Sequence, residues 1–128
     1  MDDARCHRLA GELDTTVVAV DYRLAPAHPY PVPLVDCYDA LRWLADLPGL
    51  DRARVAIAGA SAGGVLAAAL ALLARDRGEV DLTAQVLVYP MLDDRSAHRA
   101  DPVPAHRRLW NNTSGRQGVA GRSRRWWP

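Results

Sequence analysis

Three short apolar segments alternate with stretches whose apolar residues recur at helical spacing, and this alternation constrains the fold more than any other feature of the chain. A continuous apolar segment is typical of a strand buried on both faces of a parallel sheet. Helices between such strands act as right-handed crossovers, so the pattern predicts an α/β fold with three parallel strands. The expected strands are 15–21, 54–58 and 84–89, and the expected helices are 2–13, 34–47 and one that follows residue 64 and ends near 77.

The segment 22–33 interrupts this alternation with four prolines, at positions 26, 29, 31 and 33. Because proline fixes φ and lacks an N–H, we expect an extended, irregular connection between the first strand and the second helix. Asp21 and Arg23 flank its start, and we expect them to hold the connection through hydrogen bonds rather than to take part in catalysis.

The pattern Gly59-x-Ser61-x-Gly63 falls between a predicted buried strand and a predicted buried helix. A serine hydroxyl is a poor nucleophile, so it has to project from a sharp strand-to-helix turn where a base can reach it. Such a turn is strained and needs small neighbours, which Gly59, Gly63 and Gly64 provide. The N–H of Ala62, at the start of the helix, is expected to point where an oxyanion would form.

Two other interpretations of this turn use the same residues. In the first, Ser61 caps the helix and the glycines only permit a tight turn, and the pentapeptide alone does not decide against it. In the second, the turn binds a dinucleotide. The glycine spacing does not fit that motif, and the next strand ends in Tyr89-Pro90 rather than in the acid that would hold a ribose.

Several strings of the sequence point to one family. They are Asp21-Tyr22-Arg23-Leu24-Ala25-Pro26, His28-Pro29-Tyr30-Pro31, Asp36-Cys37-Tyr38, Leu41-Arg42-Trp43-Leu44, Ser61-Ala62-Gly63-Gly64 and Leu87-Val88-Tyr89-Pro90-Met91-Leu92. Together they resemble the hormone-sensitive-lipase-like branch of the α/β-hydrolase fold, from about residue 1 to Asn112. The resemblance implies a serine carboxylesterase or lipase that acts on small-molecule esters of modest chain length, with Ser61 as nucleophile and with no metal or organic cofactor.

The chain also departs from that family's pattern. Ala27 stands where the family usually has Glu, and Ala60 where it usually has Asp. No oxyanion loop of the HGG type precedes the first predicted strand, and the triad acid and histidine of the family follow two further strands. Asp93 or Asp94 and His106 have the right chain order, but the acids come too early. We therefore expect a truncated fragment with negligible esterase activity on its own.

The net charge of +1 hides two unlike regions. Residues 1–94 hold eight Arg against fourteen acidic residues, a charge of −6, whereas residues 95–128 hold eight Arg against Asp101 alone, a charge of +7. We predict a partial hydrolase domain over 1–112 and an Arg-rich tail over 113–128. The tail fits a solvated extension, a nucleic-acid-binding arm with Trp126 and Trp127 for stacking, or a change of reading frame, which we favour.

Other function classes find little support. No secretory signal is visible, and the longest apolar run, Val65–Ala74, is too short to cross a bilayer, so we expect a cytoplasmic protein without a membrane span. The two cysteines, Cys6 and Cys37, have no histidine at ligand spacing and indicate neither a disulfide framework nor a zinc site. The alternative to an esterase is a non-catalytic remnant or interaction module whose exposed sheet edges favour association.

Overall fold

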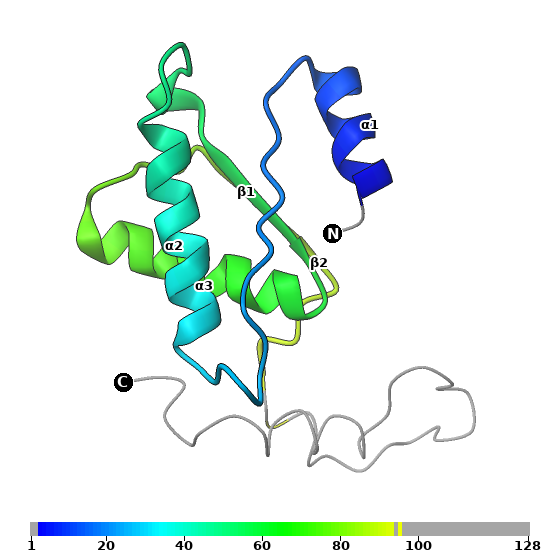
Figure 1. The fold of residues 1–128 in the computed structure, drawn as a ribbon, viewed down its shortest axis with the longest axis vertical. Helices are drawn as coiled ribbons and strands as arrows, with labels where there is room; N and C mark the ends of the chain where they lie inside the picture. The colour runs from blue at the N-terminus through cyan, green and yellow to red at the C-terminus, as the bar shows by residue number, and fades with distance from the viewer. Residues whose placement is uncertain (1–2, 94, 96–128) are drawn as a thin grey trace.

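The computed structural model describes residues 3–93 and 95, and it confirms the predicted α/β class. Its elements in chain order are α1 (Asp3–Leu13), α2 (Val32–Ala45), a 3-10 turn (Arg52–Arg54), β1 (Ala56–Ala60), α3 (Ala62–Arg77) and β2 (Ala84–Val88). The two strands are parallel neighbours, with α2 and α3 packed together beside them and α1 standing apart (Figure 1). Ala60 lies opposite Val88, so both strands end at the same edge of the sheet.

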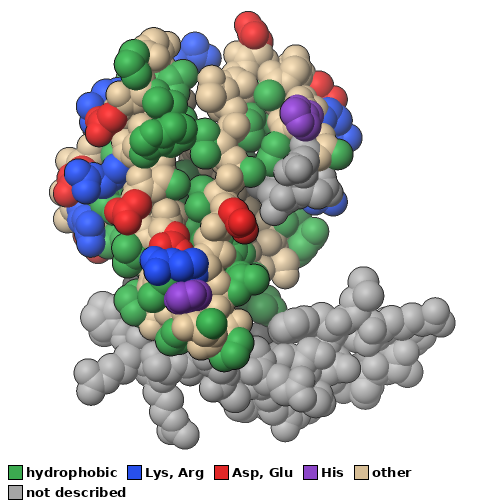
Figure 2. Space-filling view, in the orientation of Figure 1, with side chains coloured by type: hydrophobic (Ala, Val, Ile, Leu, Met, Phe, Trp, Pro, Cys, Tyr) green, Lys and Arg blue, Asp and Glu red, His purple; other side chains and the backbone are tan. Residues whose placement is uncertain are grey.

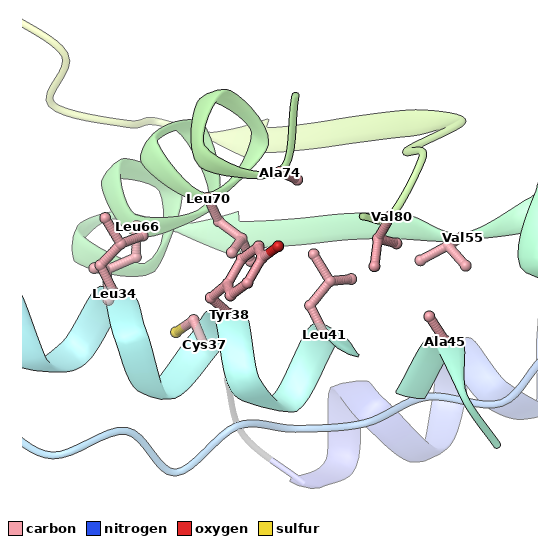
Figure 3. Packing of buried hydrophobic residues seen from close by; sticks show 10 residues of the cluster. All are labelled: Leu34, Cys37, Tyr38, Leu41, Ala45, Val55, Leu66, Leu70, Ala74 and Val80. Atoms are coloured by element: carbon pink, nitrogen blue, oxygen red, sulfur yellow. The ribbon is translucent and has the colours of Figure 1, made fainter. Parts of the chain in front are cut away.

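The core lies between α2, α3 and the start of the sheet (Figure 3). One face of α2 supplies half of it, at positions spaced three or four residues apart as in an amphipathic helix. Tyr38 is the most buried of these residues at 1% exposure, and its hydroxyl donates to Glu79 Oε2 at 2.9 Å. The buried cluster comprises Leu34, Cys37, Tyr38, Leu41, Ala45, Val55, Leu66, Leu70, Ala74 and Val80.

The outer surface of α2 carries both charged and apolar side chains. Acidic and basic side chains lie close together on this side of the molecule, with hydrophobic side chains between them (Figure 2). Arg42, on α2, forms an ion pair with Glu79 at 2.9 Å. The helix therefore presents its buried apolar residues to α3, as its spacing predicts, while its solvent side carries charged residues together with the exposed Val35 and Trp43. Within the described residues, no helix is long and apolar enough to span a bilayer.

The strand predicted over residues 15–21 is not formed. Residues 15–21 run as an extended trace after α1 but are not part of the sheet, which contains two strands rather than three among the described residues (Figure 1). The only backbone hydrogen bond of this segment within the described chain joins Thr15 N–H to Ala10 O. Its β-branched residues favour an extended backbone, but a strand also needs a neighbour whose N–H and C=O groups pair with its own.

The proline-rich connection is irregular, as predicted, and it is held against α2 by one ion pair. The Arg23 main-chain N–H donates to Asp36 Oδ2 at 3.0 Å, and its guanidinium donates to both carboxylate oxygens, Nη2 to Oδ1 at 2.6 Å. These bonds lower the pKa of the Asp36 carboxyl to about 2. The predicted role of Arg23 is confirmed. Asp21 makes no hydrogen bond to another described residue, so its predicted role is wrong.

Candidate active site

Ser61 is the single residue that joins β1 to α3. Its backbone has φ 53° and ψ −118°, a conformation that residues other than glycine rarely adopt. The turn is held from both sides, because Ser61 N–H donates to Val88 O at 3.0 Å and Ser61 O accepts from Val65 N–H at 3.2 Å. The side chain of Ser61 is exposed.

The hydroxyl of Ser61 does not cap α3. No hydrogen bond joins it to the first turn of the helix, and within the described residues it has no partner. The interpretation of Ser61 as a helix cap is therefore wrong for this structure. Ala62 begins α3, so its N–H is one of the first-turn donors that lack an acceptor inside the helix. The turn thus combines the strained backbone and exposed hydroxyl of Ser61 with the N-terminus of α3.

Close packing excludes a side chain at Gly59 and leaves little room for one at Gly64. A Cβ at Gly59 would overlap the carbonyl group of Gly63 and lie 2.8 Å from Gly64 N. A Cβ at Gly64 would lie 3.1 Å from Pro90 Cβ and 3.2 Å from Gly59 O. No atom lies within 4 Å of a Cβ built at Gly63, so space alone does not require glycine there. The close approach of β1 to α3 therefore requires glycine at Gly59, whereas a Cβ at Gly64 would require its neighbours to shift by a few tenths of an ångström.

Sequence reasoning missed the part that the end of β2 plays in this turn. Tyr89 follows β2 with a φ of 39°, and its side chain is 67% exposed. It comes directly after Val88, whose carbonyl accepts from Ser61 N–H, so two strained residues lie side by side at the edge where the strands end. Pro90 then packs against Gly64. The signal in the sequence was the Tyr89-Pro90 pair, which marks an abrupt strand end.

The described residues do not supply a proton acceptor for Ser61. His7 lies on α1, and His28 lies in the proline-rich connection close enough to Asp36 to lower the pKa of that carboxyl. Asp93 is bound by Arg95, whose Nε donates to Oδ1 at 2.8 Å. Asp94 and His106 lie outside the described residues.

A polar hollow of about 270 Å³ lies at the opposite end of α3 from Ser61. Arg42 pairs there with Glu79 at 2.9 Å, and Arg52 with Asp46 at 3.1 Å. Since α3 has 16 residues, this hollow is roughly 24 Å from Ser61 along the helix axis. It takes no part in chemistry at the strand ends. Among the described residues, no cluster of three His, Cys, Asp or Glu side chains could hold a metal ion.

A family model for the α/β-hydrolase fold matches residues 1–120. The chain belongs to the α/β-hydrolase fold family. It is 47% identical over 91 residues to the esterase LipI of Mycobacterium tuberculosis, which covers 69% of this chain and 28% of that protein. It is 44% identical over 94 residues to an arylesterase of Saccharolobus solfataricus, which covers 71% of this chain and 30% of that protein.

Solved structures agree with this assignment. A bacterial heroin esterase superimposes with a TM-score of 0.78 at 40% identity, over 88% of this chain and 37% of that one. The chain thus spans less than a third of the length of the two curated relatives above. The predicted boundary at residue 112 and the predicted Arg-rich tail over 113–128 lie outside the described residues.

Proposed function

We propose that this chain carries the nucleophile of a carboxylic ester hydrolase, and that Ser61 is that nucleophile in the Gly59-x-Ser61-x-Gly63 turn. The observation that supports this most directly is the strained backbone of Ser61 together with a hydroxyl that the helix does not use. Strain of this kind is maintained where surrounding structure enforces it, and it occurs preferentially at functional sites. The esterases among the relatives make ester hydrolysis the matching chemistry.

In this proposal Ser61 Oγ attacks the carbonyl carbon of the ester, and a covalent acyl-serine forms as the alcohol leaves. The Ala62 N–H stabilises the negative charge on the carbonyl oxygen, helped by the dipole of α3. A base outside residues 3–93 has to accept the hydroxyl proton, because no described histidine bonds to Ser61. Water then hydrolyses the acyl-serine. Only side chains, backbone and water take part, with no metal or organic cofactor.

Because the proposed mechanism needs a base from outside the described residues, we expect the chain alone to be inactive. We expect negligible turnover of p-nitrophenyl butyrate and no labelling of Ser61 by a fluorophosphonate probe, since an unactivated serine does not react. Turnover that disappears in Ser61→Ala, and that also needs Asp93 and His106, would show a working triad within this chain and would contradict the expectation.

A chimera tests the proposed nucleophile independently of the isolated chain. The 94 residues of the S. solfataricus arylesterase that match this chain are replaced by the corresponding residues of this chain. We expect the chimera to hydrolyse p-nitrophenyl butyrate and to lose activity about a million-fold with Ser61→Ala. A folded chimera that is inactive, or whose activity survives Ser61→Ala, would overturn the proposal.

Further predictions rest on the sequence alone. A nucleic-acid-binding role of residues 113–128 predicts salt-sensitive retention on heparin that is lost when these residues are deleted. A cytoplasmic location is likewise a proposal from the sequence. The alternative of a non-catalytic remnant or interaction module also stays a prediction from the sequence.

A further inference from the structure

Tyr89 differs from the other three tyrosines of the chain because it contributes nothing to the core. Tyr38 is buried, and Tyr22 and Tyr30 pack against the buried cluster. Tyr89 is 67% exposed, and its hydroxyl has no hydrogen-bond partner among the described residues. Packing within the described part of the chain therefore gives no reason for an aromatic side chain at this position.

The backbone at Tyr89 also argues against a purely structural role. Its φ of 39° lies in the left-handed region, where a bulky side chain is strained and glycine is not. The residue follows β2 rather than belonging to it, so the preference of aromatic residues for strands does not explain it. The chain thus carries a large ring where glycine would be less strained, and strain of this kind occurs preferentially at functional sites.

The register of the sheet places Tyr89 beside Ser61. Ala60 pairs with Val88, so Ser61 and Tyr89 each come one residue after the last pair of the two strands. Neighbouring strands lie about 5 Å apart. A tyrosine side chain is longer than this spacing, so the ring of Tyr89 lies within reach of a molecule bound at Ser61. The carboxyl ends of parallel strands are also where α/β folds bind their ligands.

Both sequence neighbours of Tyr89 are held against the turn that carries Ser61. On one side Val88 O accepts from Ser61 N–H at 3.0 Å. On the other side Pro90 packs on the first turn of α3, because a Cβ built at Gly64 would lie 3.1 Å from Pro90 Cβ. The base of the Tyr89 side chain is therefore fixed relative to Ser61. A fixed aromatic side chain suits a ligand site, since such sites are lined mostly by apolar and aromatic residues.

We propose that Tyr89 is a specificity-determining residue whose ring packs against an aromatic group of the ester that Ser61 attacks. Aromatic rings pair in offset or edge-to-face arrangements, and such pairs gain more than the burial of their apolar area alone provides. The favoured substrates are therefore esters whose alcohol part or acyl part carries an aromatic ring. This inference rests on the proposed nucleophile, and its test separates the failure of one from the failure of the other.

The test uses the chimera described above and measures kcat/KM for three esters. Ethyl acetate is the reference, benzyl acetate has an aromatic alcohol part, and ethyl phenylacetate has an aromatic acyl part. We expect Tyr89→Gly to lower kcat/KM for one of the two aromatic esters about tenfold relative to ethyl acetate. The ester that loses this advantage identifies the part against which the ring packs. Glycine is used because it adopts a φ of 39° without strain, so the variant is expected to fold.

Three further variants locate the effect in the ring. Tyr89→Phe removes only the hydroxyl and is expected to keep the preference for the aromatic ester. Tyr89→Leu keeps an apolar side chain without a ring and is expected to lose the preference several-fold. Trp43→Ala is the matched control, because it removes another exposed aromatic side chain, next to Arg42 at the polar hollow and far from Ser61. It should leave both relative values of kcat/KM unchanged.

The outcomes separate the specificity proposal from the proposed nucleophile. A chimera that needs Ser61 but in which Tyr89→Gly changes kcat/KM equally for all three esters would overturn the specificity proposal alone, since Tyr89 would then act only through the turn. A loss of preference in Tyr89→Phe as large as in Tyr89→Gly would overturn it too, because the contact would run through the hydroxyl. An inactive chimera, or one whose activity survives Ser61→Ala, would overturn both.

Discussion

The backbone N–H of Ser61 donates to the carbonyl oxygen of Val88 at 3.0 Å, which fixes the strand-to-helix turn to the end of the neighbouring strand. Parallel strands bring their carboxyl ends to one edge, where ligands of α/β folds bind. Because Ser61 and Tyr89 both have positive φ, the strain at this edge is shared between two turns rather than confined to one. The position of the Ser61 hydroxyl therefore depends on β2 as well as on its own turn.

Gly59→Ala is expected to destabilise the chain by about 3 kcal/mol or more, because its Cβ would overlap the backbone of Gly63 and nothing flexible can move aside. Urea unfolding monitored by circular dichroism measures the change in unfolding free energy. Gly63→Ala is the matched control, since its Cβ meets no atom within 4 Å and alanine favours a helix by roughly 0.5–1 kcal/mol. Equal effects of the two substitutions would contradict this account of the turn.

The Arg23–Asp36 ion pair predicts a pH dependence of stability. The pKa of Asp36 is about 2 in the folded chain, below its ordinary value of 3.8, so the bonds of its carboxylate stabilise the fold fully above pH 3.8. That contribution is lost as the pH falls from 3.8 through 2. We expect Asp36→Asn to be less stable than the unchanged chain at pH 6 and to differ less from it at pH 2. If the unfolding free energies of the two proteins differed by the same amount at pH 6 and at pH 2, this role of the Arg23–Asp36 ion pair would be contradicted.

The elements with a complete sequence signal were predicted well. The apolar spacing of α2 identified its buried face, although the helix begins at Val32 rather than at 34, because Pro33 fits the first turn. The turn at Ser61 was placed from its small residues and its position between an apolar strand and an apolar helix. In each case the signal is local, so a few consecutive residues determine the result.

The failures depend on partners distant in the sequence. Residues 15–21 have the composition of a buried strand, but pairing is a property of two segments, and the described chain offers this one no neighbour. The contact of Pro90 with Gly64 spans 26 positions and follows from the register of β1 against β2, which no local pattern encodes. Val86 and Val88, which are 54% and 42% exposed, likewise have no covering neighbour among the described residues.

The two cysteines are expected to differ in reactivity. Cys37 is buried against the core, and burial raises the pKa of its thiol from an ordinary 9.0 to about 11, which lowers its thiolate fraction at pH 8 roughly 100-fold. Cys6, on α1, is partly exposed. Iodoacetamide at pH 8 should therefore modify Cys6 first, and Cys37 should react only as the chain unfolds, so that mass spectrometry of labelling in urea follows the Cys37 site. Prompt modification of Cys37 in the native chain, at the rate of Cys6, would show that α2 does not shield it.

The raised pKa of the Cys37 thiol also predicts a pH dependence of stability. The protonated thiol stabilises the fold fully below pH 9, and this contribution is lost between pH 9 and 11.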